Sequence, residues 1–181
     1  MKTKTILSML CTLGFVGWCM SGCGPIDSYS EIPEIKFKEI VVEERLDTLG
    51  NKMKMAILTF SFIDGDGDLG VRPIDVIMDE RISKIYYTWE QKMPDGEYKQ
   101  YQFANGETTM TSDIPYSEVM NKNEAQNKVL KGTIQIELNP PKQQGLDIMR
   151  IEFYITDRAD HKSNIEYTPD FSLLNSSVVS Q

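Results

Sequence analysis

The sequence predicts an all-β protein, an immunoglobulin-like antiparallel β-sandwich of about seven strands. The main observation is a repeated alternation of apolar and polar residues, the period of a strand with one buried face. It is clearest at residues 148–156, where apolar side chains recur at every second position. Turn signals separate these segments, and Pro94-Asp95-Gly96 predicts a hairpin. Trp89 falls on the inward face of the third expected strand, as a tryptophan does in immunoglobulin sandwiches.

The alternation and the turns together place each expected strand. Residues 105–131 show no clear period, and a short helix is expected within residues 117–127. Short strands separated by turns at this spacing favour an antiparallel sandwich. The expected strands are residues 33–40, 54–63, 82–91, 98–104, 131–138, 148–156 and 163–168.

The N-terminus predicts export and a lipid anchor. Lys2 and Lys4 precede an apolar stretch that is shorter than the about 20 residues needed to span a bilayer. Small residues before Cys23 resemble the lipobox of bacterial lipoproteins, in which the cysteine is lipidated; an ordinary cleaved signal is the alternative. We therefore expect a signal peptide at 1–22, a lipidated tether at 23–31 and one domain at 32–181. The expected location is the bacterial outer membrane, on its periplasmic or surface face.

Cysteine usage and charge restrict the domain further. Cys11, Cys19 and Cys23 all lie in the leader or at its end, so the expected domain has no disulfide. An exported domain without disulfides depends on its core or on a bound metal ion. The formal net charge is −8, and loss of the two leader lysines leaves 17 basic against 27 acidic residues, or −10. Nucleic acid is therefore excluded as an expected partner, and membrane association is expected through the lipid alone.

An acidic loop, Asp64-Gly65-Asp66-Gly67-Asp68-Leu69-Gly70, directly follows the second expected strand. Carboxylate oxygens are the ligands that Ca²⁺ prefers, and glycines allow the tight turns that bring them together. The spacing resembles an EF-hand loop, but Leu69 stands where that loop needs glycine, and Asp75 where it needs glutamate. The flanking segments also alternate like strands. A solvated turn without metal is the alternative.

A second acidic loop follows the expected strand at 148–156. Loops after the second and sixth strands of an immunoglobulin sandwich emerge at the same end. The two loops are therefore expected to meet and to form one Ca²⁺ site. Its expected ligands are Asp64, Asp66, Asp68, Asp157 and Asp160.

Two segments carry a resemblance to a known family. Residues 60–70 (FSFIDGDGDLG) and 155–164 (ITDRADHKSN) resemble segments of uncharacterised Bacteroidota lipoproteins with a cadherin-like, immunoglobulin-like domain. Cadherin modules also place an acidic Asp-x-Asp after their second strand. The second segment is similar to the Asp-x-Ala-Gly-Asn turn of many bacterial sandwiches, with Asp160 and His161 in place of Gly-Asn. The resemblance implies the fold and brings no assigned reaction.

The scarcity of candidate catalytic residues predicts that the protein is not an enzyme. His161 is the only histidine and is expected to be a solvated loop residue, so zinc hydrolases and nucleophilic triads lack their parts. We expect a non-catalytic, calcium-stabilised module that binds or organises an envelope protein or a glycan. A glycan-binding surface is the alternative, and a carboxylate-based glycoside hydrolase is a weaker one. The aromatic residues considered for sugar stacking are Tyr86, Tyr98, Tyr101, Phe103 and Tyr154.

Overall fold

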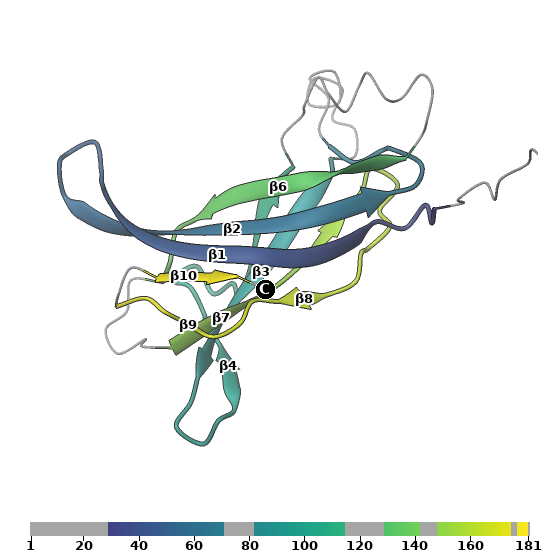
Figure 1. The fold of residues 1–181 in the computed structure, drawn as a ribbon. Helices are drawn as coiled ribbons and strands as arrows, with labels where there is room; N and C mark the ends of the chain where they lie inside the picture. The colour runs from purple at the N-terminus through teal and green to yellow at the C-terminus, as the bar shows by residue number, and fades with distance from the viewer. Residues whose placement is uncertain (1–28, 71–81, 115–128, 142–147, 175–176, 181) are drawn as a thin grey trace, which may run out of the picture.

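Two antiparallel β-sheets, packed face to face, make up the fold (Figure 1). The computed structural model describes residues 29–70, 82–114, 129–141, 148–174 and 177–180. Within these ranges the regular elements are strands, and none of them contains a helix long and apolar enough to cross a membrane.

The first sheet has the strand order β10-β1-β2-β6. Strands β1 and β2 form a long hairpin whose turn closes by hydrogen bonds between Asp47 and Asn51. The hairpin curls past the ends of the neighbouring strands in Figure 1, which explains why both strands are longer than the sequence predicts. The strands are β1 (Glu34–Leu46), β2 (Lys52–Asp64), β6 (Leu130–Leu138) and β10 (Ser177–Ser180).

The second sheet has the order β4-β3-β7-β8, with β5 also paired to β3 and β9 also paired to β7. Strands β3 and β7 are therefore at its centre, as β1 and β2 are in the first sheet. The strands are β3 (Lys84–Lys92), β4 (Tyr98–Gln100), β5 (Thr109–Asp113), β7 (Ile148–Thr156), β8 (Glu166–Tyr167) and β9 (Phe171–Ser172).

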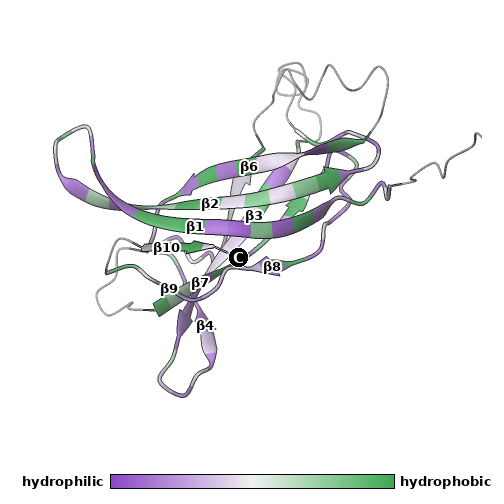
Figure 2. Cartoon of the chain, in the orientation of Figure 1, coloured by the Kyte–Doolittle hydropathy of each residue, from purple (hydrophilic) through white to green (hydrophobic). Residues whose placement is uncertain are grey.

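The core lies between the sheets because each strand turns its apolar side chains to one face, and Figure 2 shows this alternation of hydropathy along β1 and β2. Phe60 of β2 and Phe153 of β7 are fully buried, and their ring centroids are 5.3 Å apart across the two sheets. Burying one such side chain stabilises a fold by about 1.5–3 kcal/mol. Trp89 is also fully buried and packs edge-on against Phe171 at 6.0 Å, so the sequence places it correctly in the core.

The predicted fold class is confirmed. Strands β1, β2 and β6 correspond to A, B and E of an immunoglobulin sandwich, and β4, β3, β7 and β8 to C′, C, F and G. The predicted C and F strands differ from β3 and β7 by at most two residues at an end.

Among the strands of the described residues, three were not predicted and two are shorter than expected. Strand β5 has no apolar alternation and forms because it pairs along the first half of β3; β9 and β10 are likewise too short to show a period. The strand expected at 98–104 ends at Gln100 because Phe103 enters a turn closed by its bond to Glu107. The strand expected at 163–168 is reduced to β8, since the Ser163 and Thr168 hydroxyls accept backbone bonds from β7.

Some expectations lie outside the described residues. These are the signal peptide at 1–22, the lipidation site at Cys23 and the helix within residues 117–127.

Candidate metal centre

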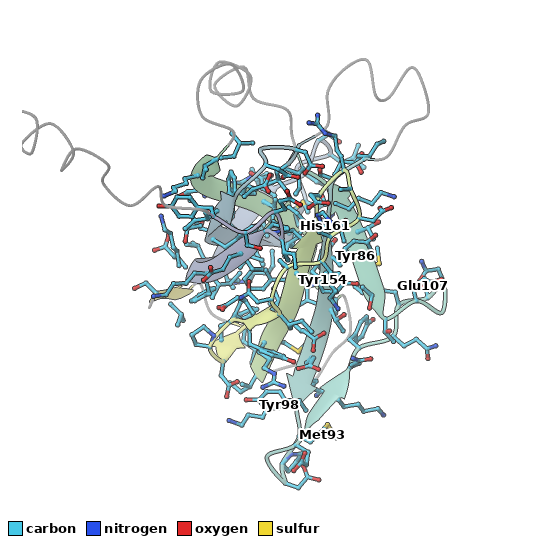
Figure 3. All side chains as sticks on the ribbon, turned by 90° about the vertical axis from the view of Figure 1, so that its right-hand side faces the viewer. Tyr86, Met93, Tyr98, Glu107, Tyr154 and His161 are labelled. Carbon is cyan, nitrogen blue, oxygen red and sulfur yellow. The ribbon has the colours of Figure 1, made fainter. Side chains whose placement is uncertain are left out.

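The two acidic loops lie at the same end of the sandwich. Strand β2 ends at Asp64, and β7 ends one residue before Asp157, so each central strand delivers a carboxylate where it ends. Figure 3 places His161, from the loop after β7, near Tyr86 and Tyr154, with Tyr98 and Met93 toward the far end. We call Asp64, Asp66, Asp68 and Asp157 the acidic pole.

Three of these residues form a compact cluster. Asp64, Asp68 and Asp157 each offer a carboxylate oxygen, and the three oxygens lie within 4.8 Å of one another. Asp64 and Asp157 are completely buried, and Asp68 is half-buried. Buried carboxylates at this spacing repel one another by several kcal/mol unless a proton or a cation intervenes.

Several oxygens of the pole lack a hydrogen-bond donor. Asp64 Oδ2 accepts the backbone N–H of Leu69 at 2.9 Å, but buried Asp64 Oδ1 has no partner. The same is true of Asp66 Oδ1 and Asp68 Oδ1. Buried polar atoms are nearly always satisfied in folded proteins, so three unpartnered oxygens in one loop are unusual. The donor set, all carboxylate oxygen, suits Ca²⁺.

The pKa values of two aspartates of the acidic pole are raised. Burial raises the pKa of Asp64 to about 7, the Leu69 N–H opposes this, and the Asp66 and Asp68 carboxylates add to it. Burial also raises the pKa of Asp68 to about 6, helped by the charge of Asp157. Without a cation, the pole therefore holds protons at a pH where ordinary aspartates have lost them.

His161 orients Asp157, which the sequence did not reveal. Asp157 Oδ1 accepts the His161 backbone N–H at 2.8 Å, and Oδ2 lies 3.0 Å from the imidazole Nδ1. The His161 side chain is 38 % exposed, so it is only partly solvated. The negative charge of Asp157 raises the pKa of His161. The histidine thus fixes the position of a buried carboxylate, as ligand-orienting residues do around metal ions.

Asp160 is placed differently from the other predicted ligands. It is exposed at the turn after Asp157, its N–H bonds to the Asp157 carbonyl at 3.3 Å, and it is not one of the three clustered carboxylates. Its φ of 66° is the left-handed conformation that glycine favours. Asp160 therefore takes the backbone role of the glycine in the Asp-x-Ala-Gly-Asn turn, a conformation that aspartate tolerates better than most residues.

The acidic loop is held by backbone geometry and by Ser83. Gly67 and Gly70 have φ of 74° and 107°, in the left-handed region that favours glycine. The buried Ser83 hydroxyl accepts the Gly70 N–H at 3.0 Å and lies 3.5 Å from the Asp68 carbonyl. Serine before a strand carries no sequence signal for this role.

The aromatic residues considered for sugar stacking have other contacts. Tyr101 and Phe103 meet edge to face at 5.0 Å and pack against the core. Tyr86 stacks on Tyr154 at 4.8 Å, and Lys162 Nζ lies 3.8 Å from the centroid of the Tyr154 ring. The Arg150 guanidinium lies 3.4 Å from the Tyr98 ring centroid. Each of these rings therefore already contacts another side chain of the protein through a face or an edge.

Fold and site define a class: an immunoglobulin-like β-sandwich with a buried carboxylate cluster where its central strands end. No protein-family model and no curated protein matches the chain. Crystal structures of OgpA from Akkermansia muciniphila are distantly similar to this chain. The wild-type structure has a TM-score of 0.40 at 10% identity over 89% of this chain and 33% of OgpA. The catalytically inactive form in complex with an O-glycopeptide substrate has a TM-score of 0.39 at 10% identity, over 84% and 32%. The chain thus spans about a third of OgpA, and a likeness of this size carries no functional information.

Proposed function

We propose that the protein is an exported, lipid-anchored protein of the bacterial cell envelope whose β-sandwich is a non-catalytic binding or scaffolding module stabilised by Ca²⁺. Cys23 carries the lipid and joins the domain to the outer membrane. We propose an envelope protein or a glycan as the partner, and the acidic chain does not suit nucleic acid.

One observation carries the calcium part of the proposal. The fully buried Asp64 has an oxygen without a partner, and that side chain belongs to the cluster with Asp68 and Asp157. Folding a domain around such a charged group is unfavourable unless a proton or a cation neutralises it, and at a pH above the raised pKa of Asp64 only a cation can do so. Carboxylate oxygens up to 4.8 Å apart can share an ion at Ca²⁺ bond lengths of about 2.3–2.6 Å.

Four carboxylates from two loops give the ion most of its ligands. Asp64, Asp66 and Asp68 come from the loop after β2, and Asp157 comes from the loop after β7. Backbone carbonyls and water complete the about 6–8 oxygens that Ca²⁺ takes. Because β2 and β7 belong to different sheets, the ion joins the two sheets at this end. This is the stabilising role that disulfides have in many exported sandwiches.

Thermal unfolding in Ca²⁺ and in chelator tests the proposal. Extracellular sites bind Ca²⁺ at about 10⁻⁴–10⁻³ M, so a tenfold excess over Kd should stabilise the domain by about 1.4 kcal/mol. For a domain of this size, that raises Tm by about 4 °C. Mg²⁺ at the same concentration should give a smaller shift, because it holds its water more tightly.

The doubly substituted protein Asp66→Asn, Asp68→Asn locates the effect. Its Tm should be the same in Ca²⁺ and in chelator. An unchanged Tm in the unsubstituted protein would refute the calcium proposal. A calcium response that survives the double substitution would place the ion elsewhere.

A further inference from the structure

The segment by which the chain enters the domain is held by both loops of the acidic pole. We call residues 29–37 the entry segment; it runs from the first described residue into β1. It includes the last residues of the predicted tether, so it is the part of the domain closest in sequence to the lipid.

The loop after β2 holds the entry segment through Gly65. The Gly65 N–H donates to the Ser30 carbonyl at 3.0 Å. A Cβ atom on Gly65 would lie 2.2 Å from that oxygen and 2.7 Å from the Tyr29 carbonyl oxygen, a contact that no side chain can make. Gly65 is not in the left-handed region, so it is the packed entry segment that requires glycine here.

The loop after β7 holds the entry segment through Asn164. Its side-chain oxygen accepts the Ile35 N–H at 2.8 Å, and its side-chain nitrogen donates to the Ile35 carbonyl at 2.9 Å. Glu166 continues this contact by accepting the Phe37 N–H at 3.2 Å. One amide side chain thus replaces a strand partner at the start of β1.

A third contact fixes Tyr29 itself. Lys131 Nζ lies 3.7 Å from the centroid of the Tyr29 ring. Lys131 is on β6 opposite Ile63, the residue before Asp64. The entry segment therefore contacts the acidic loop, the loop after β7 and the strand beside them.

We infer that Ca²⁺ at the acidic pole locks the entry segment onto the domain and so fixes the direction in which the lipidated tether leaves it. The inference rests on the proposed calcium site. Gly65 lies between two proposed ligands, Asp64 and Asp66, so the loop shape that binds the ion is also the shape that receives Ser30. Binding linkage is reciprocal: if the ion favours the docked segment, the docked segment strengthens ion binding by the same factor.

The variant Gly65→Ala tests this coupling in the full mature chain, because it changes no carboxylate and displaces Ser30. We expect its Kd for Ca²⁺, measured by calorimetry, to rise about tenfold, within the range of known couplings. Gly96→Ala is the matched control: its Cβ would meet nothing within 4 Å, and its φ of 90° makes it destabilise the fold away from the pole. The control should bind Ca²⁺ with unchanged affinity.

Hydrogen exchange of the unsubstituted protein is the second measurement and needs no variant. Ca²⁺ should slow amide exchange in residues 29–37 as well as in residues 64–70, and should leave the β3–β4 hairpin unchanged. If calorimetry detects no Ca²⁺ binding, the proposed site itself is refuted. If Ca²⁺ binds but exchange in residues 29–37 does not respond, or folded Gly65→Ala binds as tightly as the unsubstituted protein, the lock is refuted and the site remains.

Discussion

In chelator at pH 8, the Asp64→Asn protein is expected to be more stable than the unsubstituted protein by up to about 4 kcal/mol. The pKa of Asp64 rises from its ordinary value of 3.8 to about 7 in the folded state, chiefly because the side chain is buried. Each unit of such a shift corresponds to about 1.4 kcal/mol between the two protonation states. Asparagine keeps the oxygen that accepts the Leu69 N–H and removes the buried charge.

The sign of the pH dependence follows from the raised pKa. A carboxyl group whose pKa is higher in the folded state binds its proton more tightly there than in the unfolded chain. Protonation at low pH therefore stabilises the fold. That contribution is complete below about pH 4 and is lost as the pH rises through about 7. The free energy of unfolding of the chelated, unsubstituted protein should therefore fall between pH 5 and pH 8, and the fall should be smaller in Asp64→Asn.

Denaturant unfolding at pH 5 and pH 8, with and without Ca²⁺, measures all of these effects. Ca²⁺ should stabilise the unsubstituted protein at pH 8 and leave Asp64→Asn unchanged. Asp113→Asn, at an exposed position on β5, is the control and should behave like the unsubstituted protein. A chelated Asp64→Asn protein that is less stable at pH 8 would contradict the view that the buried charge is unfavourable.

The second large effect is expected in the core. Phe153→Ala should lower the free energy of unfolding by about 3–5 kcal/mol, because the ring is fully buried and contacts Phe60 across the sheets. Such a loss is a large part of the about 5–15 kcal/mol that stabilises a typical domain. Tm should fall by about 10 °C.

The same unfolding experiment contains its own check. The midpoint should move while the slope with denaturant stays constant, since the surface exposed on unfolding is nearly unchanged. Thr111→Ala, exposed on β5 in the same sheet, should change stability by no more than about 0.5 kcal/mol. A loss below about 1 kcal/mol for Phe153→Ala would mean that the two sheets do not depend on this contact.

Sequence alone determined the fold class and the positions of the long strands. Alternation gave β7 its bounds because a half-buried strand must place an apolar residue at every second position. The acidic loop could also be recognised from the sequence, since three aspartates and three glycines in seven residues have few structural uses. Trp89 was assigned to the core by the same period.

Only the tertiary structure decided which acidic residues meet. Asp157 joins the pole while nearby Asp160 remains exposed in the left-handed conformation at the turn that follows. The His161 contact with Asp157 and the Gly65 contact with Ser30 depend on how loops and termini pack, which no local period encodes. Strand β5 shows the same limit, because it forms by pairing with β3 and has no apolar pattern of its own. Local sequence encodes which face of a strand is buried, whereas contacts between distant segments are set by the packing of the whole chain.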